Sequence, residues 1–300
     1  MHLHSFLNYL NPWIQLFRWN KPTGRLILLI PAAWSLWLSP SSPPSIKMFI
    51  MIILGGISIS AAGCIINDLW DQNIDRKVAR TSKRPLVIKS ISQKNAIISL
   101  IFFLILSLLI ASNLPNGNQN LILKLSFILL PFIVLYPTAK RWFQYPQILL
   151  SFCWGFCVLI PWAAQEGDLK GVSLFTCWLA TCLWTFGFDT VYAIADREDD
   201  KKIGINSSAI SLKTNTFKVV SVSYSLTILL MGISCYFSGI SIIFWPLLIL
   251  IFFIMQYEVR VLEKKLNKVK QISIHFRNQS LLGTLLLLSI ILGKILYINL

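Results

Sequence analysis

The sequence predicts an all-α polytopic membrane protein, folded as one bundle of nine transmembrane helices with its N-terminus in the cytoplasm. Three observations predict this fold: the composition, the spacing of the apolar runs and the positions of the basic residues. Of the 300 residues, 55% are hydrophobic and only 13% are charged, against roughly 25% charged in an average soluble domain. The mean hydropathy of +0.67 is spread along the chain. This distribution indicates a single integral-membrane domain that comprises residues 1–300.

Nine apolar runs each come close to the roughly 17–25 residues that a helix needs to span the hydrocarbon of a bilayer. The first and fourth runs are near the lower limit, and only a short turn separates the seventh from the eighth. The predicted spans lie at about 24–39, 48–66, 96–112, 121–137, 146–164, 173–195, 217–237, 239–257 and 279–298.

The basic residues test this map independently, because short cytoplasmic loops carry an excess of Lys and Arg. With the N-terminus inside, every Lys and Arg falls on the inward side except Lys47, Lys124, Lys170 and Lys294. So strong an asymmetry favours an odd number of spans with the C-terminus outside. It also places the polar segments at the cytoplasmic face of a multi-pass protein, for which a bacterial inner membrane is expected.

The net charge of +15 predicts neither a nucleic acid nor a protein partner. The basic residues sit in short loops beside the apolar spans and form no nucleic-acid-binding motif, so anionic lipid and phosphate suit them better. The six cysteines all lie in or at the ends of apolar spans and are expected to serve packing. Residues 3–17 place Phe6, Leu10, Trp13 and Phe17 at helical spacing, which indicates an amphipathic helix at the membrane interface or an ordinary leader.

Three inward segments are long and polar: 67–95, 196–216 and 258–278. The third, which begins at Glu258, pairs opposite charges at helical spacing without clustering acids, so we expect a solvated connector. His275 in this segment is expected to lie on the surface. The first two segments are different because each carries an acidic motif.

The two acidic motifs follow a common pattern. Asn67 and Asp196 are separated by 129 residues, and so are Asp71 and Asp200. Two related halves, about 1–140 and 141–300, each with one acidic site, would produce this spacing.

The first motif repeats Asn67, Asp71 and Asp75 every four residues, which places their oxygens on one helix face. Like charges at this spacing repel each other, and carboxylates oppose the dipole at a helix C-terminus. A divalent cation relieves both penalties, and an oxygen-only donor set favours Mg²⁺ shared with a phosphate-bearing substrate. Asp196 and Asp200 offer a second such site, and two sites could clamp one diphosphate.

Basic residues surround these acids, and interleaved cations suit phosphate oxygens. We favour Arg84, Lys140 and Arg141 as ligands, because the first lies in a Lys-Arg-Pro turn and the others end the segment YPTAKR (136–141). Solvated acidic loops, a cation transporter and a phosphatidyl-type phosphotransferase are the alternatives. The acids cluster at one face of the membrane and not at mid-span, which argues against a cation transporter. The sequence also lacks the DG followed by AR pattern of the phosphatidyl-type phosphotransferases.

At these residues the chain resembles the UbiA-type intramembrane aromatic prenyltransferases, most closely their 4-hydroxybenzoate polyprenyltransferase branch. The resemblance covers most of the chain. It rests on RWNKPTG (18–24), NDLWDQNID (67–75) with the following RT (80–81) and KRPL (83–86), YPTAKR (136–141) with YPQ (145–147), and DTVYAIADREDDKKIGINS (189–207). It implies a nine-helix bundle around a central cavity that opens sideways to lipid, capped by the two acidic motifs.

The resemblance also implies roles for individual residues. Asp189, one helical face deeper than Asp196, would orient or deprotonate the acceptor or form structural hydrogen bonds. Arg18 or Lys21 would pair with the acceptor carboxylate or anchor the interface. Tyr136, Trp184 and the substrate-binding candidate Tyr192 would stabilise a carbocation or serve packing. The implied Mg²⁺ ligands are Asn67, Asp68, Asp71, Asp75, Asp196, Asp199 and Asp200.

The implied reaction is transfer of a polyprenyl group from an all-trans polyprenyl diphosphate to the ring carbon ortho to the hydroxyl of 4-hydroxybenzoate. The pathway would be ubiquinone or plastoquinone biosynthesis. Homogentisate or dihydroxynaphthoate as the acceptor remains open, and so does the length of the prenyl chain.

Overall fold

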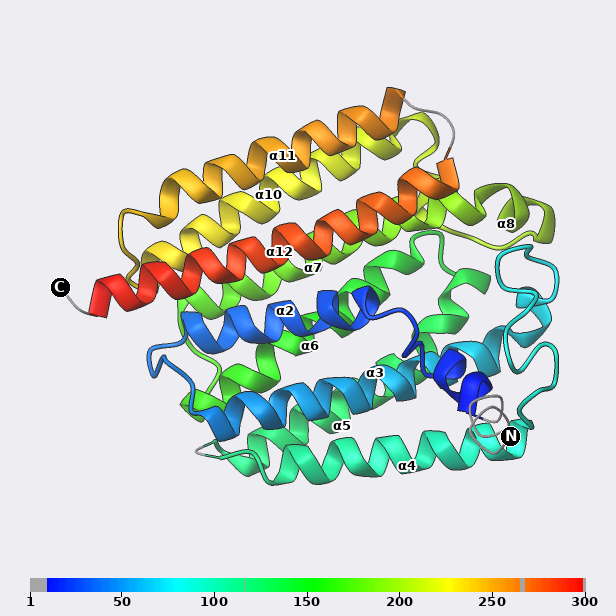
Figure 1. Cartoon of the computed structure of the whole chain (residues 1–300), viewed down its shortest axis with the longest axis horizontal. Coiled ribbons are helices and arrows are strands. Elements are labelled where there is room, and N and C mark those ends of the chain that lie inside the picture. Colours follow the sequence, from blue (N-terminus) through cyan, green and yellow to red (C-terminus); the bar gives the residue numbers. More distant parts are fainter. Residues whose placement is uncertain (1–9, 116, 265–267, 299–300) are drawn as a thin grey trace, which may run out of the picture.

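In the computed structural model, which describes residues 10–115, 117–264 and 268–298, the chain is a helix bundle with no strand in these ranges (Figure 1). The helices that form the bundle run roughly parallel or antiparallel to one another. They are α2 (Thr23–Leu38), α3 (Ile46–Asp75), α4 (Gln93–Ser112), α5 (Gln119–Leu135), α6 (Pro146–Glu166), α7 (Val172–Ala193), α10 (Thr216–Phe237), α11 (Phe244–Lys264) and α12 (Lys268–Ile298).

Within the described ranges, eight segments are long and apolar enough to cross a membrane. The shorter apolar helix α2, with 16 residues, accounts for the remaining predicted span. The prediction of a polytopic all-α membrane protein is therefore confirmed. Nine crossings and a cytoplasmic N-terminus stay predictions.

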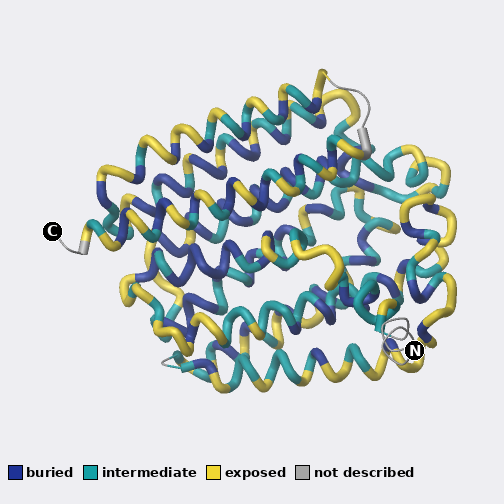
Figure 2. The backbone as a smooth tube through the Cα atoms, in the orientation of Figure 1, coloured by how far each residue is buried: buried dark blue, intermediate teal, exposed yellow. Residues whose placement is uncertain are grey.

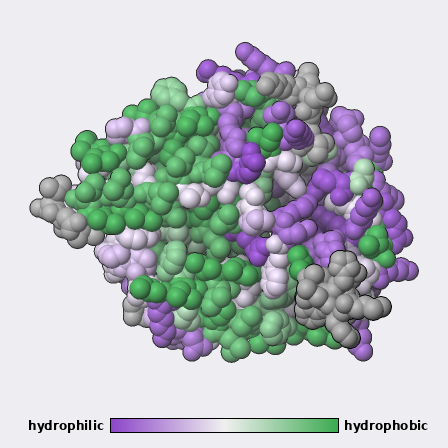
Figure 3. All heavy atoms as spheres, viewed as in Figure 1, coloured by the Kyte–Doolittle hydropathy of each residue, from purple (hydrophilic) through white to green (hydrophobic). Residues whose placement is uncertain are grey.

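Short helices join the long ones at one end of the bundle. They are the 3₁₀ turns η1 (Tyr136–Arg141), η2 (Ile194–Asp196) and η3 (Lys213–Asn215), and the helices α8 (Arg197–Ile203) and α9 (Ser208–Ser211). We call this end, where α8 lies, the acidic end. Hydrophilic side chains gather over it in Figure 3, while hydrophobic side chains cover most of the remaining face.

The apolar side chains divide between the interior and the lipid-facing surface. Large aromatic residues fill the interior, where Trp34, Trp162 and Trp184 are at most 2% exposed. Many outward residues of α4 and α11 are apolar and exposed, such as Phe102 and Phe253. Figure 2 shows this alternation of buried and exposed positions along the helices. It is the pattern of a bundle whose outer face meets hydrocarbon instead of water.

The beginning of the described chain is helical from Leu10 to Leu16. Phe17 follows and packs its ring 4.9 Å from Phe103 on α4, so this segment lies against the bundle. The remaining part of the predicted amphipathic helix, including Phe6, lies outside the described residues.

The predicted solvent exposure of the third polar segment is wrong for two of its side chains. Most of the segment is helix, as its helical charge spacing allows, because α11 continues to Lys264 and α12 begins at Lys268. His275 is 3% exposed and the side chain of Glu258 is 12% exposed. Neither lies in solvent, because α11 and α12 pack against each other at this level and enclose both side chains.

Candidate active site

The first acidic motif lies on the last turns of α3, which extends past the predicted span without a break. Asp68, Asp71 and Asp75 are all at most 4% exposed, and Asn67 is half-buried. The expectation that one helix carries this motif is confirmed. Burying three carboxylates near one helix C-terminus is unfavourable unless positive charges compensate them.

Arginine side chains from two different segments compensate two of these carboxylates. Nη2 of Arg18 lies 2.5 Å from Oδ1 of Asp68. Nη1 of Arg84 lies 3.0 Å from the same oxygen and 2.6 Å from Oδ2 of Asp75. Arg84, predicted as a diphosphate ligand, therefore bridges two acids of the first motif.

The third carboxylate, Asp71, receives its cations from η1. Nζ of Lys140 contacts Oδ2 of Asp71, and Nη2 of Arg141 lies 3.4 Å from Oδ1. Arg141 also donates to the carbonyl oxygen of Trp70 at 2.7 Å. The 3₁₀ turn directs both basic side chains onto the end of α3, so the structure brings these predicted ligands to the predicted acid.

The second acidic motif lies across η2 and α8, where α7 passes through a 3₁₀ turn into the next helix. Asp196 is held by Arg80, whose Nε donates to Oδ1 at 2.9 Å and whose Nη2 contacts Oδ2. Oδ2 of Asp199 accepts a hydrogen bond from the backbone N–H of Ala79 at 3.3 Å. The segment after the first motif therefore reaches across to the second one.

Arg80 was not among the residues singled out as ligands, yet it joins the two motifs. Its guanidinium also lies 5.1 Å from the ring centre of Tyr192 and donates to the Tyr192 hydroxyl at 3.1 Å. A bidentate ion pair combined with an aromatic contact is an arrangement that arginine supports and lysine does not. The sequence feature that could have identified Arg80 was the RT dipeptide (80–81) shortly after the first motif.

Lys21 is the predicted substrate-binding cation that makes no ion pair among the described residues. Partial burial lowers its pKa from the ordinary lysine value, and the nearby positive charges of Arg80, Arg18 and Arg84 lower it further. The three neighbouring guanidinium groups are each paired with a carboxylate, whereas the Lys21 ammonium has no such partner among the described residues. A cation without an acidic partner favours an anionic ligand.

Asp189 and Asp200 also form no ion pair in the described ranges. Asp189 lies on α7 two turns before Asp196, and both Asp189 and Asp71 are close enough to the phenol of Tyr136 to interact with it electrostatically. Asp71, Asp189 and Tyr136 therefore lie near one another, although they come from three different elements. Trp184 is different, because it is fully buried, with its ring centre 5.0 Å from that of Trp34 in a tilted contact, and so it belongs to the interior of the bundle.

The acids do not form a ready-made metal cluster, since no three His, Cys, Asp or Glu side chains of the described chain are grouped for one ion. Their oxygens nevertheless fit Mg²⁺, which takes one or two carboxylates and completes its shell with phosphate and water. Oδ2 of Asp68 is buried and has no hydrogen-bond partner, so it is an oxygen with free coordinating capacity. The predicted ligand set stays a prediction.

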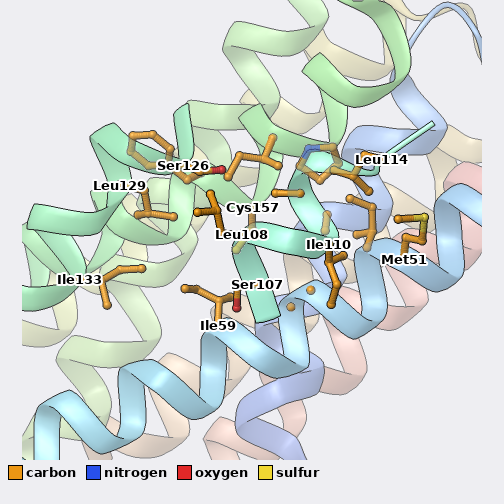
Figure 4. A pocket seen from close by; sticks show the side chains of 18 of the residues that line it. Met51, Ile59, Ser107, Leu108, Ile110, Leu114, Ser126, Leu129, Ile133 and Cys157 are labelled. Carbon is orange, nitrogen blue, oxygen red and sulfur yellow. The ribbon is translucent and has the colours of Figure 1, made fainter. Parts of the chain in front are cut away.

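An apolar cavity of about 250 Å³ lies between α2, α3, α4, α5 and α6 (Figure 4). Its inner wall includes Ala32 and Phe156, which are at most 5% exposed, while Ile105 and Phe127 at its rim are more than half exposed. The two serine hydroxyls in its wall donate to carbonyl oxygens of their own helices, Ser107 to Phe103 and Ser126 to Ile122. The cavity therefore offers hydrocarbon surroundings and opens between α4 and α5.

The cavity approaches the acidic end through α3 and α5. Ile59 lies about 13 Å before Asp68 along α3, at 1.5 Å per residue. Ile133 lies three residues before Tyr136, whose phenol is near Asp71. The cavity and the first acidic motif thus lie on the same helices, α3 and its neighbours.

Comparison with known proteins agrees with this geometry. The profile of the UbiA prenyltransferase family matches residues 28–297. The 4-hydroxybenzoate solanesyltransferase of Synechocystis sp. is 45% identical over 216 residues, which is 72% of each chain. The 4-hydroxybenzoate octaprenyltransferase of Marinomonas sp. is 39% identical over 68% of this chain and 70% of its own length.

Solved structures share the fold at lower identity. A UbiA homolog from Aeropyrum pernix K1 superposes with a TM-score of 0.72 at 22% identity, covering 90% of this chain and 97% of its own. A UbiA homolog from Archaeoglobus fulgidus, bound to GPP and Mg²⁺, superposes with a TM-score of 0.70 at 19% identity, covering 94% and 99%.

Proposed function

The chain belongs to the UbiA prenyltransferase family, and on this premise we propose that it transfers a polyprenyl group from an all-trans polyprenyl diphosphate to 4-hydroxybenzoate. The new bond forms at the ring carbon ortho to the hydroxyl, and diphosphate is released. The relatives named for solanesyl and octaprenyl transfer favour a long donor in quinone biosynthesis. Ubiquinone and plastoquinone remain equal candidates for the end product.

The observation that carries this proposal is the joining of the two acidic motifs by a cluster of cations at one end of an apolar bundle. Arg80, five residues after the first motif in sequence, pairs with Asp196 of the second, and Arg84 pairs with both Asp68 and Asp75. Cations already paired with carboxylates can exchange them for phosphate oxygens at little cost in charge. Mg²⁺, when bound by these carboxylates, would neutralise the diphosphate as a leaving group.

The residues beneath the motifs supply the remaining chemistry. The bond between the allylic carbon and the diphosphate oxygen breaks, and the electron pair leaves with the diphosphate. The ring carbon then forms the new carbon–carbon bond and loses its proton, for which Asp189 is the proposed acceptor. We propose that buried apolar side chains around the site exclude the water that would trap the allyl cation, and that the aromatic rings of Tyr136 and Tyr192 stabilise the cation.

Lys21 is proposed to bind the carboxylate of the acceptor, because it is the cation of the cluster that no described acid neutralises. Arg18 is less suited to this role, because its contact with Asp68 places it beside the first acidic motif, where the diphosphate is proposed to bind. The apolar cavity is proposed to hold the donor tail beyond its first units, with the excess passing between α4 and α5 into lipid. The orientation with the acidic end in the cytoplasm of a bacterial inner membrane is part of the same proposal.

The direct test measures prenyl transfer in membranes that carry the protein. Solanesyl diphosphate and radiolabelled 4-hydroxybenzoate are supplied with Mg²⁺ or with EDTA, and lipid-extractable label is counted. We expect label that depends on Mg²⁺ and is lost in the D71N and D196N variants. Label that appears with homogentisate or dihydroxynaphthoate instead would retain prenyl transfer and reject this acceptor, and no label with any acceptor would reject the function.

A further inference from the structure

A second buried polar cluster lies away from the acidic motifs, at the contact of α10, α11 and α12. Its centre is Glu258, whose Oε2 lies 3.0 Å from Nδ1 of His275 in a geometry that does not complete a hydrogen bond. Asn278 and Gln279 donate their amide N–H groups to the two oxygens of the Glu258 carboxylate. On its other side, Nε2 of His275 lies 2.9 Å from the hydroxyl of Tyr224.

We call this cluster the Glu258 network; it consists of Glu258, His275, Asn278, Gln279, Tyr224 and Trp184. It links four helices, because Nε1 of Trp184 on α7 donates to Oε1 of Gln279 at 2.9 Å. An ionisable group placed inside a membrane bundle is costly, and such groups usually serve function. Neither the diphosphate nor the acceptor, as proposed above, requires this network.

The same part of α12 also faces the donor site. Phe276, the residue after His275, packs its ring 5.6 Å from Phe188 and 5.3 Å from Tyr192. Tyr192 in turn holds Arg80 through its ring and its hydroxyl, and Arg80 holds Asp196. A continuous series of contacts therefore leads from α12 to the cation that joins the two acidic motifs.

The network fixes α7 as well as α12. Tyr224 lies so close to α7 that a Cβ on Gly187 would meet its ring at 2.5 Å, so the two helices touch through the glycine. Buried hydrogen bonds of defined geometry restrict sliding and rotation, whereas apolar contacts permit other registers at small cost. Phe276, the residue after His275, lies on the part of α12 that these hydrogen bonds hold.

We propose that Glu258 and His275 are positioning residues, which lock α12 against α7, α10 and α11 so that Phe276 supports Tyr192 and the Arg80–Asp196 contact in binding the donor diphosphate. This inference rests on the proposed function, because it assigns the donor to the acidic end. It predicts that disturbing the network weakens donor binding and leaves acceptor binding unchanged.

The test compares H275L, F276L and the double variant with the wild-type protein in detergent. The dissociation constant of geranyl diphosphate is measured with Mg²⁺, and the KM of each substrate is measured in the transfer assay. We expect H275L and F276L each to raise the dissociation constant and the donor KM about tenfold, a typical coupling between contacting residues. The KM for 4-hydroxybenzoate should not change.

The double variant provides the sharpest readout. If the network acts through Phe276, the double variant binds the donor no more weakly than either single variant. The proposal would be overturned if the increases in dissociation constant of the two single variants multiplied in the double variant. It would also be overturned if H275L lowered the Tm but left the affinity for the donor unchanged. F276L leaves the network residues intact, so it remains informative if H275L fails to fold. F253L, on the lipid-facing side of α11 where Phe253 is 62% exposed, is the matched control.

The binding measurement and the transfer assay distinguish a failure of this inference from a failure of the proposed function. Wild-type protein that binds geranyl diphosphate but transfers no prenyl group would reject the acceptor or the reaction, while the binding arm still tests the network. Wild-type protein that transfers, with variants that bind the donor normally, would reject the network's role alone.

Discussion

The acidic end and the apolar cavity are neighbouring regions of one bundle, but they are built on opposite principles. At the acidic end, directional ion pairs from several segments fix each buried carboxylate, as Arg84 does for Asp68 and Asp75. The cavity has only apolar walls and self-satisfied hydroxyls, and its rim is open. The difference indicates that the headgroup of the donor is held in one geometry, while its tail is held by burial without regard to its exact length.

The largest expected effect comes from removing a carboxylate at the acidic end. D71N deprives Lys140 and Arg141 of their buried partner and removes a proposed metal ligand. We expect kcat to fall about 10²- to 10³-fold, the range found when one preorganised electrostatic group is lost. The loss should be equal for geranyl and solanesyl diphosphate, measured as lipid-extractable label. A loss confined to the long donor would contradict the assignment of this end to the headgroup.

The next effect concerns the contact between the two motifs. R80M leaves Asp196 without its bidentate partner, so we expect kcat/KM for the donor to fall about 30- to 100-fold, within the range for truncating one member of such a pair. R80K should recover only part of the activity, since lysine cannot make two parallel hydrogen bonds. Initial rates at varied donor concentration measure both variants. Full recovery by lysine would show that charge alone matters.

A smaller effect is expected at Lys21. K21M removes a cation that lies near Arg18, Arg80 and Arg84 and has no acidic partner among the described residues, so the KM for 4-hydroxybenzoate should rise about tenfold, the loss of one charge-assisted contact of roughly 1.4 kcal/mol. The donor KM should stay near the wild-type value. K213M changes a lysine of η3 and serves as the control. A rise in the donor KM instead would assign Lys21 to the diphosphate.

The smallest effect is expected in the cavity. S107F places a ring where the wall now carries a small hydroxyl, so we expect a loss of only about three- to tenfold with solanesyl diphosphate, comparable to overpacking by 1 kcal/mol or so. Geranyl diphosphate should react at the normal rate, because its tail is too short to reach this level.

L109F is the matched control for the cavity prediction. It introduces the same ring on the same helix, at a residue that is 56% exposed and outside the cavity wall. Equal losses in S107F and L109F would show that the cavity does not hold the tail. If S107F lowered the activity equally with geranyl and solanesyl diphosphate, the cavity would not be specific to the tail of the donor, and its proposed difference from the acidic end would be wrong.

Much of this site could be predicted from local sequence alone. The four-residue spacing of Asn67, Asp71 and Asp75 places them on one helix face wherever α3 packs. Lys140 and Arg141 were singled out because they end the segment YPTAKR, and the structure shows that η1 directs both onto Asp71. Arg80 was missed as a bridge because its partner, Asp196, is distant in sequence. No local pattern encodes a contact between segments that only the folded bundle brings together.

The sequence by itself determined that this chain is a membrane-embedded helix bundle with two acidic motifs at one end, because hydropathy, charge and helical periodicity act over short stretches of chain. The tertiary structure decided where Glu258 and His275 lie. Their segment has the charge pattern of a solvated surface, but the packing of α11 on α12 encloses both and gives them buried partners. Burial depends on neighbours from the whole fold, and charge pattern alone does not specify it.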